Sequence, residues 1–452
     1  MSYIVSCLVG NFLVGLSAAV PVLTDPEPRR NFIAEAGLAV TDNYHPLIRV
    51  PLGRDDLLQQ QHYADDQDDD LGPRQLGPGS GSGTDHVRAI PTQTEYLMQV
   101  GVGGANWSMI PDTGSSDTWL MSSAYQCLDR SHAAQAQTYC NFGPLYPGAF
   151  SGGKIAGQHM NITYGGGDSL NGDFGYADVT VAGLTVPNQQ ISLVTSASIR
   201  GNGLMSGILG LGLRGLTTAY LGTDPSADGD ANAERYPPLV ETMSVNGTIS
   251  PVFSVAMSRN DSRSFISFGG VPPSIKTGEF ATVPISKSID LMSAYLQISI
   301  NHKTPEYLYY GLKPESVTFN NTETSSNWTQ PGLMIVDTGT TLTYLPKDVA
   351  DGIANLFSPP AQYYGSGTYT VPCDATPPTV NVGLGGKKFS IDPSSLILPE
   401  TRMPEFDADY CTIGIARGSG TYILGDVFLQ EMLVVFDVSD KKEMKFAQRV
   451  DK

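Results

Sequence analysis

The chain has 452 residues and a formal net charge of −18. This length exceeds one ordinary hydrophobic core and predicts two or three domains. The acidic balance excludes nucleic acid as a partner, because binding phosphates requires a basic face. With 49 glycines and 31 prolines, the composition favours a turn-rich, mostly β chain.

The N-terminal end predicts export from the cell. Residues 3–20 are apolar and end in small residues, which predicts a signal peptide over residues 1–19, cleaved near Ala19. A short anchor helix is the alternative. No other stretch is long and apolar enough to cross a membrane, so we expect no stable membrane association.

A different composition follows in residues 20–86. This segment contains an acidic run at 65–70 and a glycine- and serine-rich stretch at 77–83. Such a composition buries little apolar surface and is typical of a linker. Its place between a leader and a long ordered body predicts a propeptide, and a plain disordered tail is the alternative.

Short apolar runs separated by glycine begin near residue 94. They predict β-strands at 96–102, 108–111, 190–194, 253–257, 264–268 and 433–438. Helical patterns are brief and cover 237–245 and 347–357. Residues 213–235, rich in Gly, Asp and Ala, predict a surface insertion.

Four cysteines follow the leader: Cys127, Cys140, Cys373 and Cys411. Three pairings are formally possible. We favour the local pairs Cys127–Cys140 and Cys373–Cys411, since one pair follows each copy of the motif described next. The sequence also contains six N-glycosylation sequons, which support secretion, at Asn106, Asn161, Asn246, Asn260, Asn320 and Asn327.

The most informative feature is a duplicated Asp-Thr-Gly. One copy reads MIPDTGSSDTWL around Asp112, and the other reads MIVDTGTTLTYL around Asp337. A second pair of motifs follows in the same order: Gly-Ile-Leu-Gly ending at Gly210, and Tyr-Ile-Leu-Gly ending at Gly425. An apolar-apolar-Gly segment fits a strand packed beside the aspartate turn, where a Cβ would clash. Two half-sites facing each other are therefore expected.

Two carboxyl groups held close together cannot both ionise easily, so one of them keeps a proton. The pair is then an acid and a base in one place, which suits hydrolysis by an activated water molecule. A nucleophilic Ser or Cys is not needed. The histidines have no metal-ligand spacing, and neither a metal nor a cofactor is expected.

These motifs together resemble the pepsin-like aspartic proteases, over residues 94–448. The resemblance implies an all-β, bilobal fold with two pseudo-symmetric lobes, a central cleft and a few short helices. We expect an N-terminal lobe at 87–255 and a C-terminal lobe at 256–452. Asp112 and Asp337 would then be the catalytic pair, one from each lobe.

The resemblance also assigns roles to the residues that flank each aspartate. The threonines after them, Thr113 and Thr338, would hydrogen-bond the two loops together. The glycines would let backbone N–H groups approach the carboxylates. The hydroxyls that follow would bind the outer carboxylate oxygens. These supporting residues are Thr113, Gly114, Ser115, Thr338, Gly339 and Thr340.

A mobile β-hairpin whose tyrosine covers the cleft is a further family feature. The run NITYGGGDS matches it, with Tyr164 as the flap tyrosine, hydrogen-bonded to Trp119. Gly165 and Gly166 would make the tip mobile, with Gly166 standing where the family usually has threonine. By hypothesis, Asp168 near the tip accepts a Lys or Arg side chain just before the cleaved bond.

Ile110 and Ile208 align with family positions near the catalytic floor. The resemblance therefore implies broad cleavage between bulky hydrophobic residues of an extended polypeptide. The predicted function is an aspartic endopeptidase made as a zymogen, monomeric, inhibited by pepstatin-type compounds, and extracellular or vacuolar. The alternatives are a catalytically silent peptide-binding protein of this fold and a two-carboxylate glycosidase.

Overall fold

A computed structural model describes residues 81–89, 95–164, 167–258, 263–275, 277–287, 307–319, 326–327, 333–398, 410–430 and 432–449. The predicted signal peptide and nearly all of the predicted propeptide lie outside these residues. Among the described residues, no helix has both the length and the apolar character needed to span a membrane.

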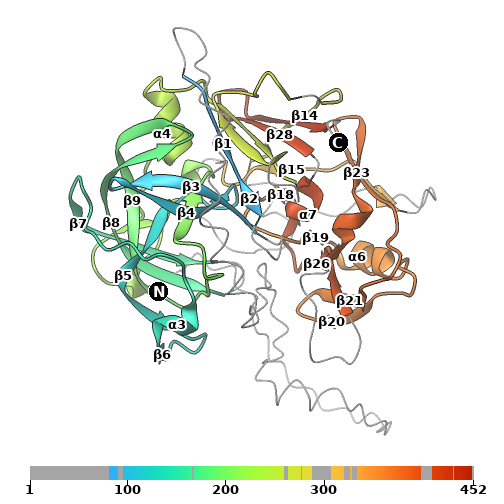
Figure 1. Cartoon of the computed structure of the whole chain (residues 1–452), viewed down its shortest axis with the longest axis horizontal. Helices are drawn as coiled ribbons and strands as arrows, with labels where there is room; N and C mark the ends of the chain where they lie inside the picture. The colour runs from blue at the N-terminus through green and yellow to red at the C-terminus, as the bar shows by residue number, and fades with distance from the viewer. Residues whose placement is uncertain are drawn as a thin grey trace, which may run out of the picture.

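The N-terminal half is built on one long mixed sheet, mostly antiparallel but with the parallel pairs β4–β10 and β5–β9, drawn in blue to green in Figure 1. Ten described strands belong to it, in the order β11-β7-β8-β9-β5-β10-β4-β3-β2, with β6 beside β5. The strands are β2 (Arg88–Ala89), β3 (Tyr96–Val102), β4 (Ala105–Asp112), β5 (Trp119–Leu128), β6 (Ala134–Gln135), β7 (Lys154–Thr163), β8 (Ser169–Val181), β9 (Leu184–Ala197), β10 (Gly207–Gly210) and β11 (Ala219–Leu221).

The C-terminal half contains three smaller sheets, drawn in orange and red on the other side of the molecule (Figure 1). In the described part of the chain the first has the order β15-β18-β27-β19-β26, the second β17-β16-β22-β23 and the third β20-β21-β25-β24. The strands are β15 (Gly311–Leu312), β16 (Ser316–Phe319), β17 (Ser326–Asn327), β18 (Met334–Val336), β19 (Thr343–Leu345), β20 (Gln362–Gly365), β21 (Thr368–Pro372), β22 (Val380–Leu384), β23 (Lys387–Ile391), β24 (Ile397–Leu398), β25 (Tyr410–Ile413), β26 (Ile415–Arg417) and β27 (Tyr422–Leu424).

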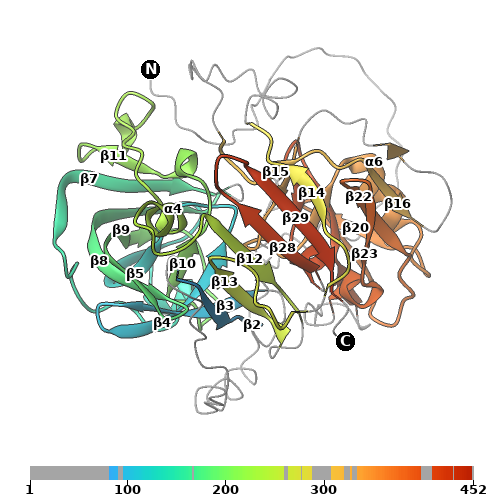
Figure 2. The same cartoon turned by 90° about the horizontal axis from the view of Figure 1, so that it is seen from above.

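A central sheet lies between the two halves and takes strands from both, as Figure 2 shows from above. Its order is β1-β13-β12-β28-β29-β14, built from β1 (Gly83–His86), β12 (Val252–Ala256), β13 (Phe265–Phe268), β14 (Ala281–Pro284), β28 (Met432–Asp437) and β29 (Glu443–Gln448). Phe253 stacks on Phe436 across the sheet, with ring centroids 4.6 Å apart. One large hydrophobic cluster runs from the N-terminal sheet through this central sheet into the C-terminal sheets.

The helices found among the described residues are short. They are α3 (Gln137–Cys140), α4 (Leu239–Val245), α6 (Lys347–Ala354) and α7 (Asp426–Leu429), with the 3-10 turns η1 (Arg214–Leu216), η2 (Pro225–Ala227) and η4 (Pro393–Leu396). In α6, Val349, Ala350 and Ile353 are buried at the spacing of one helix face. The mostly β, bilobal class predicted from the sequence is thus confirmed.

Two sequence boundaries fall inside the central sheet. The predicted end of the propeptide coincides with the last residue of β1, and the predicted lobe boundary lies within β12. Residues 213–235 were predicted as a surface insertion, and this is wrong in part. Their strand β11 pairs with β7, and Ala219 and Tyr220 are buried in the contact.

Candidate active site

Both aspartate turns are built in the same way. Strand β4 ends at Asp112 and runs parallel to β10, with Gly210 beside Asp112. Strand β18 leads into Asp337 and runs parallel to β27. The strand that follows each aspartate turn pairs antiparallel with that same neighbour. Strand β5 pairs with β10 through Trp119 and Ile208, and β19 pairs with β27 through Tyr344 and Ile423. The sequence repeat is therefore also a structural repeat.

Each carboxylate is held by its own loop. Asp112 Oδ1 accepts a hydrogen bond of 2.7 Å from the Gly114 N–H, and Asp337 Oδ1 accepts one of 2.8 Å from Gly339. The outer oxygens accept from hydroxyls: Ser115 donates to Asp112 Oδ2, and Thr340 donates to Asp337 Oδ2 at 2.6 Å. The side chains thus have fixed orientations.

The two carboxyl groups face each other across the loops. A Cβ placed on Gly114 would lie 2.5 Å from Cγ of Asp337, and one on Gly339 would lie 2.6 Å from Oδ1 of Asp112. No side chain larger than hydrogen fits at either position without displacing the opposite carboxyl group. The glycines are therefore required by close approach.

Two threonines connect the loops. The Thr113 N–H donates to Thr338 Oγ1 and the Thr338 N–H donates to Thr113 Oγ1, both at 3.1 Å. Each hydroxyl then donates to a carbonyl of the opposite strand, Thr113 to Val336 at 2.8 Å and Thr338 to Pro111 at 2.7 Å. Both side chains are buried, so these four bonds fix the distance between the aspartates.

The two aspartates differ in how deeply they are buried. Asp112 is only 6% exposed, whereas Asp337 is half-buried. Burial raises the pKa of Asp112 well above its ordinary value, and the negative charge of Asp337 raises it further. The hydrogen bonds from Ser115 and Gly114 act in the opposite direction but are smaller. Burial and the facing carboxyl group thus both favour a protonated Asp112 at pH values where a free aspartate is ionised, and the pair shares one proton.

A third carboxyl group near the pair was not identified from the sequence. Asp426, the first residue of α7, is 2% exposed, and its Oδ1 has no hydrogen-bond partner among the residues that the structure describes. Burial raises its pKa well above the ordinary value, followed by the negative charges of Asp337 and Glu95. The sequence did hold a signal, because Asp426 follows the second apolar-apolar-Gly where the first copy has Leu211.

Tyr164 lies at the end of β7, in the hairpin between β7 and β8. The Trp119 indole N–H donates to the Tyr164 hydroxyl at 2.9 Å, and the Tyr164 N–H donates to the carbonyl of Asp168 at 2.8 Å. Gly165 and Gly166 lie outside the described residues. Ile110 and Ile208 are paired neighbours in β4 and β10 and belong to the hydrophobic cluster that contains Trp119, with Tyr164 packed against it.

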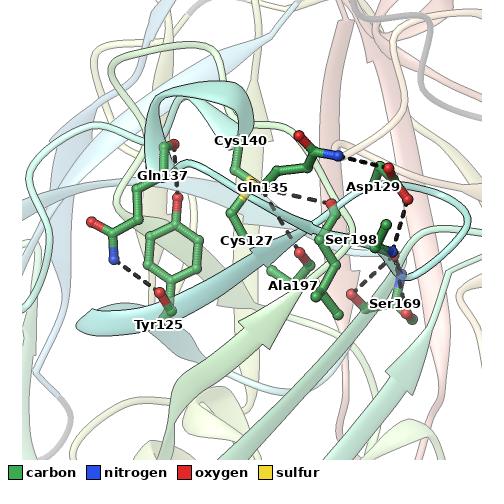
Figure 3. Close-up of a disulfide and its surroundings, with 11 residues drawn as sticks. Tyr125, Cys127, Asp129, Gln135, Gln137, Cys140, Ser169, Ala197 and Ser198 are labelled. Atoms are coloured by element: carbon green, nitrogen blue, oxygen red, sulfur yellow. Dashed lines mark hydrogen bonds between the residues drawn. A yellow bond between two sulfur atoms is a disulfide. The ribbon is translucent and has the colours of Figure 1, made fainter.

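Asp168 is buried and faces a cation of its own chain. Arg130 Nη2 lies 3.6 Å from Asp168 Oδ1, and the side chain of Arg130 is more than half exposed. Arg130 comes from the loop closed by the Cys127–Cys140 disulfide, whose surroundings are drawn in Figure 3. In that view Ser169, the residue after Asp168, lies beside Ser198, whose Oγ accepts from the Ser169 N–H at 2.8 Å.

Both favoured disulfides are present in the structure. Cys127–Cys140 connects β5 to α3, and Cys373–Cys411 connects the end of β21 to β25. Among the sequons, Asn106 and Asn246 are exposed. Asn161 is half-buried, and its Nδ2 donates to Asp228 Oδ2 at 2.9 Å and to the Pro225 carbonyl at 3.2 Å. Asn260, Asn320 and the side chain of Asn327 lie outside the described residues.

Within the described ranges, no cluster of three or more His, Cys, Asp or Glu side chains could hold a metal ion. The two aspartate turns bring together two carboxyl groups with their hydroxyl and N–H donors, and Tyr164 is connected to the strand after the first turn through Trp119.

Comparison with known proteins gives a consistent result. Residues 95–449 match the family model of the eukaryotic aspartyl proteases. A probable aspartic-type endopeptidase of Aspergillus fumigatus is 33% identical over 377 residues, which is 81% of each chain. Rhizopuspepsin-1 of Rhizopus niveus is 29% identical, over 80% of this chain and 82% of its own. The fold is similar to that of the aspartic proteinase from Irpex lacteus, with a TM-score of 0.60 and 21% identity over 82% of this chain and 98% of that one.

Proposed function

Because the chain belongs to the eukaryotic aspartyl proteases and is an aspartic-type endopeptidase, we propose that Asp112 and Asp337 together activate the water that hydrolyses the peptide bond. The observation that carries this proposal is the reciprocal geometry of the two loops. Each carboxyl group lies against the glycine of the opposite loop, and the threonine pair holds the loops together.

The pair can accept and donate the protons that this reaction requires. Asp337 takes a proton from water as the water oxygen bonds to the peptide carbonyl carbon, and the proton held by Asp112 passes to the carbonyl oxygen. The resulting tetrahedral intermediate collapses with cleavage of the C–N bond. Asp337 gives its proton to the leaving nitrogen while one hydroxyl of the intermediate returns its proton to Asp112, so the products are a carboxylic acid and an amine and the pair again holds one proton.

Polypeptides are the substrates of this family, and we propose a preference for bulky hydrophobic residues on both sides of the cut. The apolar cluster of Ile110, Ile208, Trp119 and Tyr164 beside the aspartate turn supports this preference. We keep the hypothesis that Asp168 selects a Lys or Arg side chain. Its ion pair with Arg130 adds a condition, because a substrate cation must compete with Arg130 for the same carboxylate.

We propose that the enzyme is a monomer made as a zymogen and processed outside the cytosol. Val87 is fully buried, and β1 pairs over its whole length with β13. Removing all residues up to 86 would therefore strip an edge strand from the central sheet, so we propose that processing occurs upstream of Gly81. Two disulfides and the exposed sequons at Asn106 and Asn246 support secretion, to the medium or to a vacuole.

The test is digestion of a denatured protein between about pH 3 and 5, with cleavage sites mapped by mass spectrometry, in the presence and absence of pepstatin. We expect pepstatin-sensitive cleavage between bulky hydrophobic residues. Absence of cleavage by the processed protein would favour the silent peptide-binding alternative and contradict the proposal.

A further inference from the structure

His159 lies on β7, the strand that leads to the hairpin tyrosine, and both of its ring nitrogens face acceptors. Nδ1 lies 3.0 Å from the Gly222 carbonyl oxygen, and Nε2 lies 2.9 Å from Asp228 Oδ2. A neutral imidazole donates from one nitrogen only, whereas the imidazolium donates from both. The doubly protonated ring is therefore the form that satisfies this arrangement.

The Asp228 carboxyl group, which faces the His159 ring, is buried and accepts further hydrogen bonds. Asp228 is 4% exposed and His159 is 8% exposed. Besides the ring, Asp228 accepts the side-chain amides of Asn161 at 2.9 Å and Asn232 at 3.0 Å, one on each oxygen. Three N–H donors thus converge on the Asp228 carboxyl group, and a hydrogen bond from a cationic ring to a carboxylate is charge-assisted and strong.

These bonds connect β7 to residues 217–236, here called the outer segment, which contains β11 and η2. Strand β11 lies beside β7 at the outer edge of the N-terminal sheet, as Figure 2 also shows. Further contacts reinforce the attachment, with the Gly222 N–H donating to the Gly157 carbonyl at 2.8 Å.

The other end of the outer segment is attached to the first catalytic loop. Thr218 donates from its N–H and its hydroxyl to Asp117, at 3.0 and 2.9 Å to Oδ2. Tyr236 donates to Asp117 Oδ1 at 2.6 Å. Since Asp117 belongs to the same turn as Asp112, the outer segment connects the catalytic turn to the strand that carries Tyr164.

We propose that His159 is a positioning residue whose imidazolium binds the outer segment to β7 in acid. Loss of its proton toward neutral pH then releases the segment and loosens the hairpin. Deprotonation sends one proton to solvent and leaves two acceptors competing for one N–H.

The charged and titratable groups around His159 are compatible with this behaviour. The outer segment contains four carboxyl groups, one guanidinium and, in β11, a tyrosine whose ring centroid lies 6.1 Å from that of His159. Strands β7 and β8 carry an ion pair of 2.7 Å. These groups are Asp224, Asp228, Asp230, Glu234, Arg235, Tyr220, Lys154 and Asp173. The Lys154–Asp173 pair is internally compensated, and the carboxyl groups outnumber the single guanidinium in the rest of the set.

The test is amide hydrogen exchange of the intact enzyme from pH 4 to 7.5, corrected for intrinsic rates, comparing the outer segment with residues 190–194 of β9. We expect protection around Leu221 and Gly222 to fall about tenfold more than that of β9 as the pH rises, the loss of one charge-assisted hydrogen bond. Equal loss in both regions, or constant protection of the outer segment, would overturn the proposal.

Three variants sharpen the test. His159→Gln and Asp228→Asn remove the ionic bond from either side, so both should lose the pH dependence of exchange in the outer segment. His132→Asn, at an exposed position in the disulfide loop, should keep it. Below pH 5, His159→Gln should raise KM for a peptide about two- to fivefold with little change in kcat, because it alters the position of the hairpin and not the aspartates. Retention of the wild-type pH dependence in both His159→Gln and Asp228→Asn would contradict the proposal.

Discussion

Thr113 and Thr338 bind each other's backbone: each N–H donates to the other's hydroxyl at 3.1 Å, across the boundary between the two halves of the molecule. Each hydroxyl also donates to a carbonyl of the opposite strand. The distance between the aspartates therefore depends on four buried hydrogen bonds that come from two side chains.

Replacing either threonine by alanine should impair both stability and turnover. Thr113→Ala leaves the Thr338 N–H and the Val336 carbonyl buried without their partners, at a cost of about 2 kcal/mol or more. Thermal unfolding and kcat/KM on a peptide measure the two effects. Thr113→Ser keeps the hydroxyl and serves as the matched control. Equal stability of the alanine and serine variants would show that the hydrogen bonds do not hold the loops together.

A methyl group on Gly114 should displace the opposite carboxyl group. Its Cβ would lie 2.5 Å from Cγ of Asp337, well inside van der Waals contact. We expect Gly114→Ala to reduce kcat by about 100-fold or more, because small displacements of reacting groups are costly. Gly278→Ala is the control, since its Cβ would meet only the Gln448 carbonyl oxygen at 3.6 Å. Full activity of Gly114→Ala would contradict the facing geometry.

Buried carboxyl groups should make the protein more stable in acid than near neutrality. Burial raises the pKa of Asp117, and burial together with the charges of Asp337 and Glu95 raises that of Asp426. An unfolded aspartate titrates near 3.9. Above that pH the folded state therefore binds more protons than the unfolded state, and the free energy of unfolding falls as the pH rises toward the folded-state pKa. Below it, the contribution is fully present.

Asp426→Asn tests this sign. The amide cannot ionise, so the variant should lose less stability between about pH 3.5 and 6.5 than the wild type, by about 1.4 kcal/mol for each unit of pKa shift removed. Thermal unfolding at both pH values gives the measurement. The exposed Asp440 provides the control Asp440→Asn, which should follow the wild type. A variant that loses as much stability as the wild type would show that Asp426 does not contribute.

The ion pair between Arg130 and Asp168 makes a prediction about specificity. If Asp168 accepts a substrate cation, Arg130→Gln should raise the ratio of kcat/KM for Lys-containing over Phe-containing peptides, by about two- to fivefold, as expected for a half-exposed pair. Asp168→Ser should lower the same ratio. An unchanged ratio in Asp168→Ser would remove the hypothesis and leave Asp168 as a structural partner of Arg130.

The sequence predicted the centre of the site because the information there is local and duplicated. Asp-Thr-Gly fixes a turn, a close approach and two hydroxyl donors within a few residues, and the apolar-apolar-Gly segments identify the neighbouring strands. The same reasoning predicted α4 and α6 nearly to their ends and located all six expected strands, although 190–194 covers only the middle of β9 and 108–111 only the second half of β4.

Features that depend on distant segments were missed. His159 and Asp228 are far apart in the chain, and nothing in the local pattern of either shows that they meet. Asp426 looks like an ordinary helix-start residue until the fold buries it beside Asp337. The outer segment has a loop-like composition, yet the free edge of β7 gives β11 a strand to pair with, and tertiary contact overrides composition.

The most direct test of the central claim is turnover of a peptide substrate at acid pH by Asp112→Asn and by Asp337→Asn, with folding checked by circular dichroism. The geometry predicts that each single replacement reduces kcat by at least about 1000-fold, because an amide can neither accept the proton of water nor share one with its partner. Near wild-type turnover by either folded variant would contradict it.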